Sequence, residues 1–307
     1  MADTARPRTV LALCEQIAQQ LTGAVSEPMA EARDLLSALH DAPRSWVATH
    51  ANDTLIDLLI DAARDAVTRR LAGAPMAYAT GRAAFRHLFL QVDERVLIPR
   101  PETEELVTLA LPYVGPGSTV VDVGTGSGAI ALALAQESDA ARVIGTDLSA
   151  EAIEVAEMNA RAVLKREYAR TEFLQGNLLE PLGDEVVHVV VSNPPYIALS
   201  EREALPSAVR EWEPELALFG GADGMDVIRS LVAQAELRLV AGGVLLMEID
   251  ARRAGEAVAC AAEPQWRDRQ LLADAFGRDR FVVARRTAAP ARALGESLSR
   301  ASHAILQ

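Results

Sequence analysis

Four consecutive residues, Asn193, Pro194, Pro195 and Tyr196, carry the most specific chemical signal in this sequence. They follow the apolar run VVHVVVS, which predicts a buried strand. Two prolines cannot continue a central strand, because neither can donate a ladder hydrogen bond. A strand that ends in this way would hold an amide and an aromatic ring rigidly at the edge of a sheet. The simpler alternative is a rigid turn with no chemical role.

An amide and a ring held in this way suit methyl transfer to a planar nitrogen. The lone pair of an amide or arylamine nitrogen is delocalised, so the nitrogen is a poor nucleophile. If its two N–H groups donate to the Asn193 side-chain oxygen and the Pro194 carbonyl oxygen, both its position and its direction of attack are fixed. The Tyr196 ring could stack on the planar group. Orientation of this kind can lower a barrier by roughly 7–11 kcal/mol at the upper end.

A glycine-rich stretch lies between the strand pattern STVVDV and the helix pattern AIALALAQ. Gly124, Gly126 and Gly128 would let the backbone turn sharply and approach a ligand, with a helix N-terminus beyond. The same spacing also satisfies a relaxed dinucleotide-binding fingerprint. The glycines alone therefore do not distinguish one adenosine cofactor from another, and a turn that serves only the chain path is the remaining alternative.

Asp147 ends the next strand pattern, ARVIGTD, 23 positions after Gly124. A carboxylate at this place can accept hydrogen bonds from both ribose hydroxyls of an adenosine ligand. It could instead only cap the helix that follows. The glycine loop and the acid together predict an adenosine cofactor, and Asn193 to Tyr196 favour a methyl donor over a hydride carrier.

Three further polar residues have open roles. Arg100 and Glu102, in the segment IPRPETEELV, either line the entrance of an active site or belong to the start of a helix. Arg100 is the one we expect to touch substrate or cofactor. Glu248 ends the strand pattern GGVLLMEI and is either a pocket residue or a strand-end cap.

The order of patterns predicts a small helical domain followed by an α/β domain. Residues 8 to 72 show helical patterns and no strand pattern, and AAFRHLFLQVDERVLIP, from residue 83, alternates as a hairpin does. From Glu102 onward, strand and helix patterns alternate, which is typical of a mainly parallel sheet with helices on both faces. We expect a helical substrate-docking domain at 1–80, a hairpin linker at 81–100, a catalytic domain at 101–290 and a tail at 291–307.

The clearest helix of the first domain is DTLIDLLIDAARDAVTRRLAG, which Gly73 should end. Its spacing predicts one apolar stripe that packs into the bundle. The members of that stripe are Leu55, Leu58, Leu59, Ala62, Ala66 and Leu71.

Composition argues against several classes of protein. The 307 residues carry a formal net charge of −13, which disfavours binding to a nucleic-acid backbone. No stretch approaches 18 uncharged apolar residues, so no membrane span is expected. The five histidines match no metal-ligand spacing. Cys14 and Cys260 suggest reduced thiols in a cytoplasmic protein, and no feature demands a dimer, so we expect a monomer.

Taken together, these motifs resemble the HemK/PrmC family over nearly the whole chain. The shared segments, in family order, are PMAYATGRAAFRHLFLQVDERVLIPRPETEELV, VDVGTGSGAIALALA, GTDLS, SNPPYI, ALFGGADGMDVIRSL, GGVLLMEI and DAFGRDRFVVARR. The resemblance implies a class I, Rossmann-like α/β fold with a mostly parallel seven-stranded sheet, a small N-terminal helical bundle and a connecting β-hairpin. It also implies methyl transfer from S-adenosyl-L-methionine to the glutamine amide nitrogen of the Gly-Gly-Gln motif in peptide-chain release factors, with S-adenosyl-L-homocysteine as product.

The same resemblance assigns roles to individual positions. Cofactor contacts are implied for Gly124, Thr125, Gly126, Ser127, Gly128, Asp147, Leu148, Asn177, Leu178 and Asn193. Substrate contacts are implied for Asn193, Pro194, Pro195 and Tyr196, to which we add Arg100. Of these, Asn193, Pro194 and Tyr196 would act in catalysis.

Other functions remain open from the sequence alone. A glutamine methyltransferase that acts on a ribosomal protein would share the chemistry and most motifs. A DNA adenine methyltransferase would also use such a site, but it needs a basic surface that this acidic chain does not obviously have. An NAD-dependent oxidoreductase would leave Asn193 to Tyr196 without a role. A binding module without catalysis would transfer no methyl group to any partner.

Asn177 departs from the family pattern, which commonly has an acidic residue there to accept from the adenine amino group. Its side-chain oxygen can still accept, so we expect weaker adenine discrimination rather than loss of binding. The Asn177→Asp variant should bind S-adenosyl-L-methionine with equal or higher affinity in calorimetry. A large loss of affinity would refute this interpretation.

Overall fold

Seven strands form one sheet at the centre of the larger domain, in the order β5-β4-β3-β6-β7-β9-β8. The computed structural model describes residues 7–287 of the chain. The first five strands in this order run parallel, β9 is antiparallel to β7, and β8 is antiparallel to β9. The strands are β3 (Thr119–Val123), β4 (Arg142–Asp147), β5 (Thr171–Gln175), β6 (Val187–Ser192), β7 (Leu239–Glu248), β8 (Trp266–Ala273) and β9 (Asp279–Arg286). The mostly parallel seven-stranded sheet predicted from the sequence is therefore present.

Helices cover both faces of this sheet. They are α6 (Pro101–Ala110), α7 (Ala129–Glu137), α8 (Ala150–Val163), α11 (Asp226–Arg238) and α12 (Ala254–Cys260). Side chains of a strand alternate between the faces. Val120 of β3 accordingly lies in the apolar cluster formed with α6 and α7, and its neighbour Val121 lies in the cluster formed with α11 and α12. Burial on both faces explains why these strands read as continuous apolar runs in the sequence.

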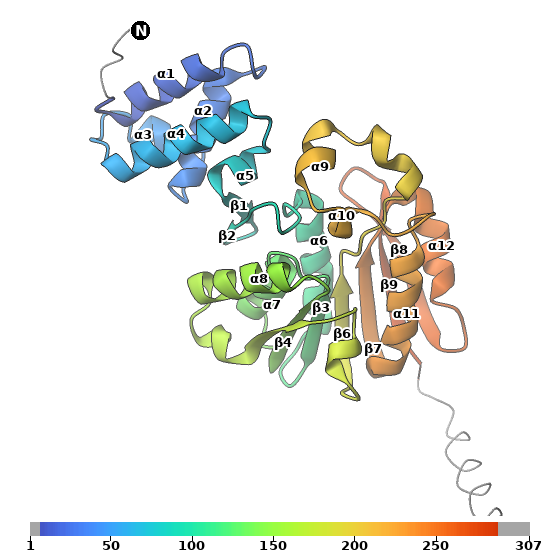
Figure 1. Cartoon of the computed structure of the whole chain (residues 1–307). Coiled ribbons are helices and arrows are strands. Elements are labelled where there is room, and N and C mark those ends of the chain that lie inside the picture. The colour runs from blue at the N-terminus through green and yellow to red at the C-terminus, as the bar shows by residue number, and fades with distance from the viewer. Residues whose placement is uncertain (1–6, 288–307) are drawn as a thin grey trace, which may run out of the picture.

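The N-terminal helices pack as a separate bundle, joined to the sheet domain through the short strands β1 (Arg82–Phe85) and β2 (Leu88–Gln91) (Figure 1). They are α1 (Val10–Leu21), α2 (Pro28–Leu39), α3 (Trp46–Thr49), α4 (Asp57–Leu71) and α5 (Met76–Thr80). The buried apolar side chains of α1 to α4 form a cluster of their own, whereas Tyr78 of α5 packs with residues of the hairpin and of α8. Such a cluster gives the bundle an independent core.

The predicted apolar stripe of the helix ending near Gly73 is wrong in part. Leu58 and Leu71 are exposed by 75% and 49%, whereas Ile60 and Val67 are buried together with Ala63 and Ala66. The alanines of this helix lie on several sides, so the spacing permits more than one apolar face. Packing against α1 and α2 selects the face with the two β-branched side chains.

The hairpin is fixed to the sheet domain by an arginine at its turn. β1 (Arg82–Phe85) pairs antiparallel with β2 (Leu88–Gln91). The Arg86 guanidinium donates to the Glu137 carboxylate of α7, at 2.6 Å from Nε, and to the Thr108 hydroxyl of α6 at 2.8 Å. The hairpin therefore docks on two helices and is not a loose linker.

Asn159 of α8 joins the hairpin to the glycine loop. Its amide is fully buried and makes three hydrogen bonds. Its Oδ1 accepts from the Gln91 N–H at 2.7 Å, and its Nδ2 donates to the carbonyl oxygens of Gln91 and Ser127 at 3.0 and 2.9 Å. The Asn159 side chain thus fixes the position of the end of β2 relative to the glycine loop.

Parts of the sequence expectations fall outside the described residues. The tail predicted at 291–307 lies outside residues 7–287, and so do residues 1 to 6 of the predicted first domain. Within residues 7–287, every helix is too short or too polar to cross a membrane.

Replacing Asn159 should cost stability, because three buried backbone groups would lose their partner. We expect Asn159→Ala to lower the free energy of unfolding by about 2–4 kcal/mol in urea titrations. The matched control is Asn52→Ala in the exposed turn before α4, which should change it by less than about 0.5 kcal/mol. Equal effects of the two substitutions would contradict the role given to Asn159.

Candidate active site

The predicted site residues leave the sheet at one edge because their strands are parallel and in register. Asp147 of β4 pairs with Gln175 of β5, and Val123 of β3 pairs with Thr146 of β4. On its other side Val123 pairs with Ser192 of β6, which in turn pairs with Met247 of β7. The segments that follow these strands therefore emerge side by side, at the edge where ligands bind in such sheets.

The glycine loop after β3 turns through left-handed backbone conformations. Gly124, Gly126 and Gly128 have φ angles of +73°, +54° and +82°. A Cβ added to Gly124 or Gly126 would meet no heavy atom within 4 Å, so open space lies beside both. Gly128 differs, since a Cβ there would come within 3.1–3.3 Å of Leu132 and Ala156. Two glycines therefore border a space that a ligand could fill, and the third allows close packing of α7.

The other two residues of the loop, Thr125 and Ser127, are buried. Thr125 donates its hydroxyl to the Asp122 carboxylate at 2.7 Å, and the Ser127 carbonyl oxygen accepts from Asn159. Both residues therefore brace the loop from beneath.

Asp147 is tied to the glycine loop directly. Its carboxylate accepts from the Gly126 N–H and from the Ser149 N–H, each at 2.9 Å. Burial raises the pKa of Asp147, and these backbone hydrogen bonds oppose the rise. The neighbouring Leu148 is 51% exposed, so an apolar surface lies next to the acid.

Asp122 is a second buried carboxylate beneath this loop. Its Oδ2 accepts from the Thr125 hydroxyl at 2.7 Å and from the Ala131 N–H at 3.0 Å. Its Oδ1 has no hydrogen-bond partner among the described residues. Burial raises the pKa of Asp122 to about 7. An orphaned oxygen of this kind suits a ligand that brings a donor or a positive charge.

A small cavity of about 150 Å³ lies at the predicted amide-binding residues. Besides Asn193, Pro194, Pro195 and Tyr196, its lining consists of Leu97, Arg100, Ile197, Val209, Ala217 and Leu218. Pockets for drug-sized ligands usually measure roughly 300–1,000 Å³. This cavity is therefore suited to one side chain, and Arg100 lies at it as expected.

Arg100 is held in place by a carboxylate that the sequence did not single out. Its guanidinium pairs with Glu213, whose side chain is buried between α9 (Ser207–Trp212) and α10 (Glu215–Leu218). Glu213 also accepts from the Ile98 N–H at 3.4 Å. The ion pair joins the segment before α6 to the segment after the two prolines, and both segments contribute residues to the cavity lining.

Asn193 and Tyr196 each make a polar contact behind the cavity wall. The Asn193 Nδ2 donates to the Thr103 hydroxyl oxygen at 3.0 Å. The Tyr196 hydroxyl donates to Glu248 at 3.4 Å, and its ring packs partly against the second core cluster. Glu248 thus contacts the lining residue Tyr196 from behind the cavity and does not itself line it. Burial raises the pKa of Tyr196 and also that of Glu248.

Asn177 and Leu178 lie beyond β5, on the far side of Asp147 from the small cavity. Asn177 is exposed and donates its Nδ2 to Glu180 at 2.8 Å, which leaves its side-chain oxygen as the acceptor. Leu178 is partly buried, with a φ of +53°. The two residues thus lie on the glycine-loop side of the edge, and Asn193 lines the small cavity.

No three histidine, cysteine, aspartate or glutamate side chains between residues 7 and 287 are grouped so that they could hold a metal ion.

Comparison with known proteins gives the family. The family model of the PrmC N-terminal domain matches residues 12–81, and that of the methyltransferase small domain matches residues 105–209. The release factor glutamine methyltransferase of Moorella thermoacetica is 39% identical over 279 residues, which are 90% of this chain and 97% of that protein. The one from Streptomyces coelicolor is 40% identical over 286 residues, 90% of this chain and 98% of its own. This chain belongs to the release factor glutamine methyltransferase family.

A methyltransferase structure from Pyrococcus furiosus supports the fold. It covers 67% of this chain and 92% of its own length, with 16% identity and a TM-score of 0.50. The resemblance to HemK/PrmC seen in the sequence and the predicted class I methyltransferase fold are both confirmed.

Sequence reasoning missed three residues of this family member's site: Thr103, Asp122 and Glu213. A signal existed for Asp122, because it is the one charged residue in the apolar strand TVVDV, directly before the glycines. Thr103 lies inside the motif IPRPETE, which pointed to Arg100 and Glu102 instead. Glu213 shows no local pattern that distinguishes it from the exposed glutamates of the chain.

Asp122 should make stability depend on pH. Its pKa is higher in the folded chain, at about 7, than the ordinary 3.8, so the folded state binds its proton more tightly. The resulting stabilisation is complete below pH 4 and is lost as the pH rises through about 7. The asparagine of an Asp122→Asn variant does not titrate. Between pH 5 and pH 8, the unfolding free energy of wild type should therefore fall by about 2 kcal/mol relative to that of the variant. Urea titrations of both proteins at the two pH values would measure this fall. A difference in unfolding free energy that stays the same at both pH values would contradict the prediction.

Proposed function

We propose that this enzyme transfers a methyl group from S-adenosyl-L-methionine to the side-chain amide nitrogen of the glutamine in the Gly-Gly-Gln motif of peptide-chain release factors. The observation that carries the proposal is the register of β3 with β6. Val123 pairs with Ser192, so the glycine loop and Asn193 leave adjacent strands at the same level. A methyl donor in the loop and an amide in the small cavity would then be neighbours.

The residues of the glycine-loop side fit this cofactor. The open space beside Gly124 and Gly126 accepts a ligand close to the backbone, and the orphaned Asp122 oxygen suits its ammonium group. We assign the methionine part to Gly124, Thr125, Gly126, Ser127 and Gly128, the ribose to Asp147 and Leu148, and the adenine to Asn177 and Leu178. Asn193 would contact both cofactor and substrate. When bound, S-adenosyl-L-methionine supplies an electrophilic methyl group on a sulfonium.

The residues of the small cavity would orient the substrate amide. The Asn193 Oδ1 and the Pro194 carbonyl oxygen would each accept one N–H, which aims the nitrogen lone pair and fixes its distance. Pro195 keeps the turn rigid, Tyr196 packs on the amide plane, and Arg100 borders the entrance. The nitrogen becomes cationic as it gains the methyl group and then releases one proton to water, so no strong base is required.

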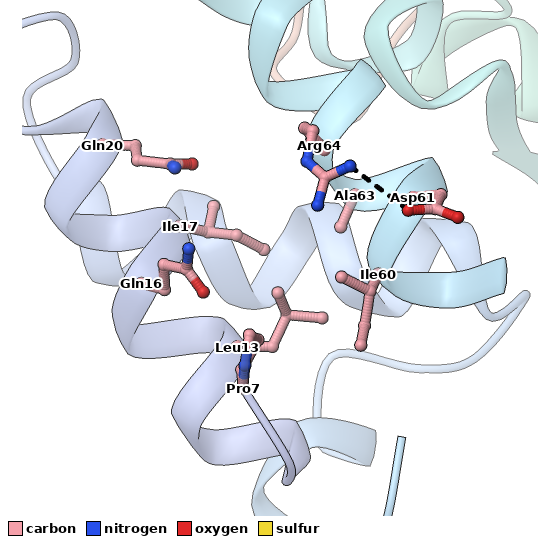
Figure 2. A pocket seen from close by; sticks show the side chains of 9 residues that line it. All are labelled: Pro7, Leu13, Gln16, Ile17, Gln20, Ile60, Asp61, Ala63 and Arg64. Atoms are coloured by element: carbon pink, nitrogen blue, oxygen red, sulfur yellow. Dashed lines mark hydrogen bonds and ion pairs between the residues drawn. The ribbon is translucent and has the colours of Figure 1, made fainter. Parts of the chain in front are cut away.

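The helical bundle would select the protein substrate. A cavity of about 150 Å³ reads only one side chain, so recognition of a whole release factor needs a second surface. A groove of about 570 Å³ lies between α1 and α4, and its lining includes Gln16 and Arg64. Leu13 and Ile17 of α1 face Ile60 of α4 there (Figure 2). We propose that part of the release factor docks there.

The remaining partner assignments follow from the same proposal. The net charge of −13 disfavours direct nucleic-acid binding. Because the proposed substrate belongs to the translation machinery, we expect the enzyme to act in the cytoplasm. We expect it to act as a monomer without contact to a membrane. A ribosomal-protein substrate is the alternative that shares every feature of the pocket.

Asn193→Ala tests the chemistry. With radiolabelled S-adenosyl-L-methionine and an intact release factor, wild type should transfer one methyl group, and the variant should be slower by about 100-fold or more. Its cofactor affinity in calorimetry should stay within about tenfold of wild type, since most cofactor contacts remain. Asn52→Ala is the control and should keep full activity.

The same experiment also tests which substrate the enzyme methylates. A short Gly-Gly-Gln peptide should be methylated with a much higher KM than the intact factor if the bundle docks the protein. Label on a ribosomal protein or on DNA, with none on the release factor, would overturn the proposed substrate. No label on any of them, with cofactor bound, would indicate a binding module.

A further inference from the structure

Behind the small cavity, three polar side chains form a chain of hydrogen bonds. Glu248, at the end of β7, has a side chain only 1% exposed. Its Oε2 accepts from the Thr103 hydroxyl of α6 at 2.7 Å. The Thr103 oxygen in turn accepts from the Asn193 Nδ2 at 3.0 Å. The chain therefore runs from a buried acid, through a hydroxyl, to the amide that we place at the substrate.

The hydrogen bond from Thr103 to Glu248 determines the direction of the hydrogen bond between Thr103 and Asn193. The Glu248 Oε2 accepts the hydrogen of the Thr103 hydroxyl, and that hydroxyl has only one hydrogen to give. Because Thr103 gives that hydrogen to Glu248, it can offer Asn193 only a lone pair. Asn193 must then turn its NH₂ group toward Thr103, and its Oδ1 is directed away from Thr103.

Burial raises the pKa of Glu248, and the hydrogen bonds from Thr103 and Tyr196 and the charge of Arg280 oppose the rise. The Arg280 Nη1 lies 3.8 Å from its Oε1, and Arg280 is itself held by Asp274, to which its Nε donates at 2.9 Å. The Tyr196 hydroxyl gives its hydrogen to the same oxygen at 3.4 Å. A cation and two hydroxyl donors thus surround the buried carboxylate.

We propose that Thr103 and Glu248 are positioning residues that set the polarity of the Asn193 amide and thereby make the cavity selective for a planar nitrogen that carries N–H groups. The inference rests on the proposed function and deepens it. With Oδ1 toward the cavity, Asn193 accepts from a substrate N–H. With the amide reversed, two N–H donors would face each other and the substrate nitrogen would lose its orientation.

Thr103→Val removes the hydroxyl and keeps the shape of the side chain. We expect its kcat with an intact release factor to fall by about 10- to 100-fold, with little change in the KM for that factor or in cofactor affinity. Thr103→Ser keeps the hydroxyl and should stay within about threefold of the wild-type kcat. Thr54→Val makes the same change at an exposed turn outside both the small cavity and the groove of the bundle, and this matched control should keep the wild-type kcat.

Glu248→Gln tests the other end of the chain at nearly constant volume. A glutamine can donate to Thr103 through its Nε2, which lets the hydroxyl donate to Asn193 and reverses the amide. The kcat should therefore fall here as well. Combining Glu248→Gln with Thr103→Val should give a double variant no slower than the slower single variant, because both act through one amide.

The outcomes separate this inference from the proposed function. If wild type transfers no methyl group to the release factor, the proposed function fails whatever Thr103 does. If wild type is active and Thr103→Val keeps the wild-type kcat, or Thr103→Ser is as slow as Thr103→Val, the positioning role is wrong. If Thr103→Val does not fold, Glu248→Gln decides alone, and a wild-type kcat in that variant overturns the role.

Discussion

The parallel pairing of β3 with β4 and β6 is the constraint on which the rest of the site depends. In a parallel ladder the carboxyl ends of all strands face the same way, and the register decides which residues stand level. Here it places Val123 between Thr146 and Ser192. The glycine loop, Asp147 and Asn193 follow these positions directly. A shift of one residue in either pairing would reverse the side-chain faces and separate the cofactor residues from the amide.

Around this edge, buried carboxylates fix the segments that the sheet does not hold. Glu213 ties Arg100 to the segment between α9 and α10, and Glu248 ties α6 to β7 through Thr103. A buried charge is costly unless it is paired and hydrogen-bonded, and both of these are. Asp122 differs, since one of its oxygens has no partner within residues 7–287 and its pKa is raised to about 7. Incomplete pairing at a ligand site is consistent with a partner that arrives with the ligand.

The sequence predicted those parts of the site that depend on contiguous residues. The glycine loop, Asp147 and the segment from Asn193 to Tyr196 each follow a strand pattern, so the fold class and the edge of the sheet could be inferred. Contacts between distant segments could not. Thr103 lies 90 positions from Asn193 and 145 from Glu248, and no local pattern records such a pairing. For the same reason the packed face of α4, chosen by its neighbours, was misjudged.

A crystal structure with S-adenosyl-L-homocysteine and a Gly-Gly-Gln peptide would test the central claim most directly. The account predicts that the glutamine amide nitrogen lies in the cavity bordered by Asn193 and Tyr196, within hydrogen-bond distance of the Asn193 Oδ1 and the Pro194 carbonyl oxygen. It also predicts that the Asn193 Nδ2 still faces Thr103 and that the homocysteine sulfur points at the glutamine nitrogen. A glutamine bound elsewhere, or one whose carbonyl oxygen meets a reversed Asn193 amide, would contradict it.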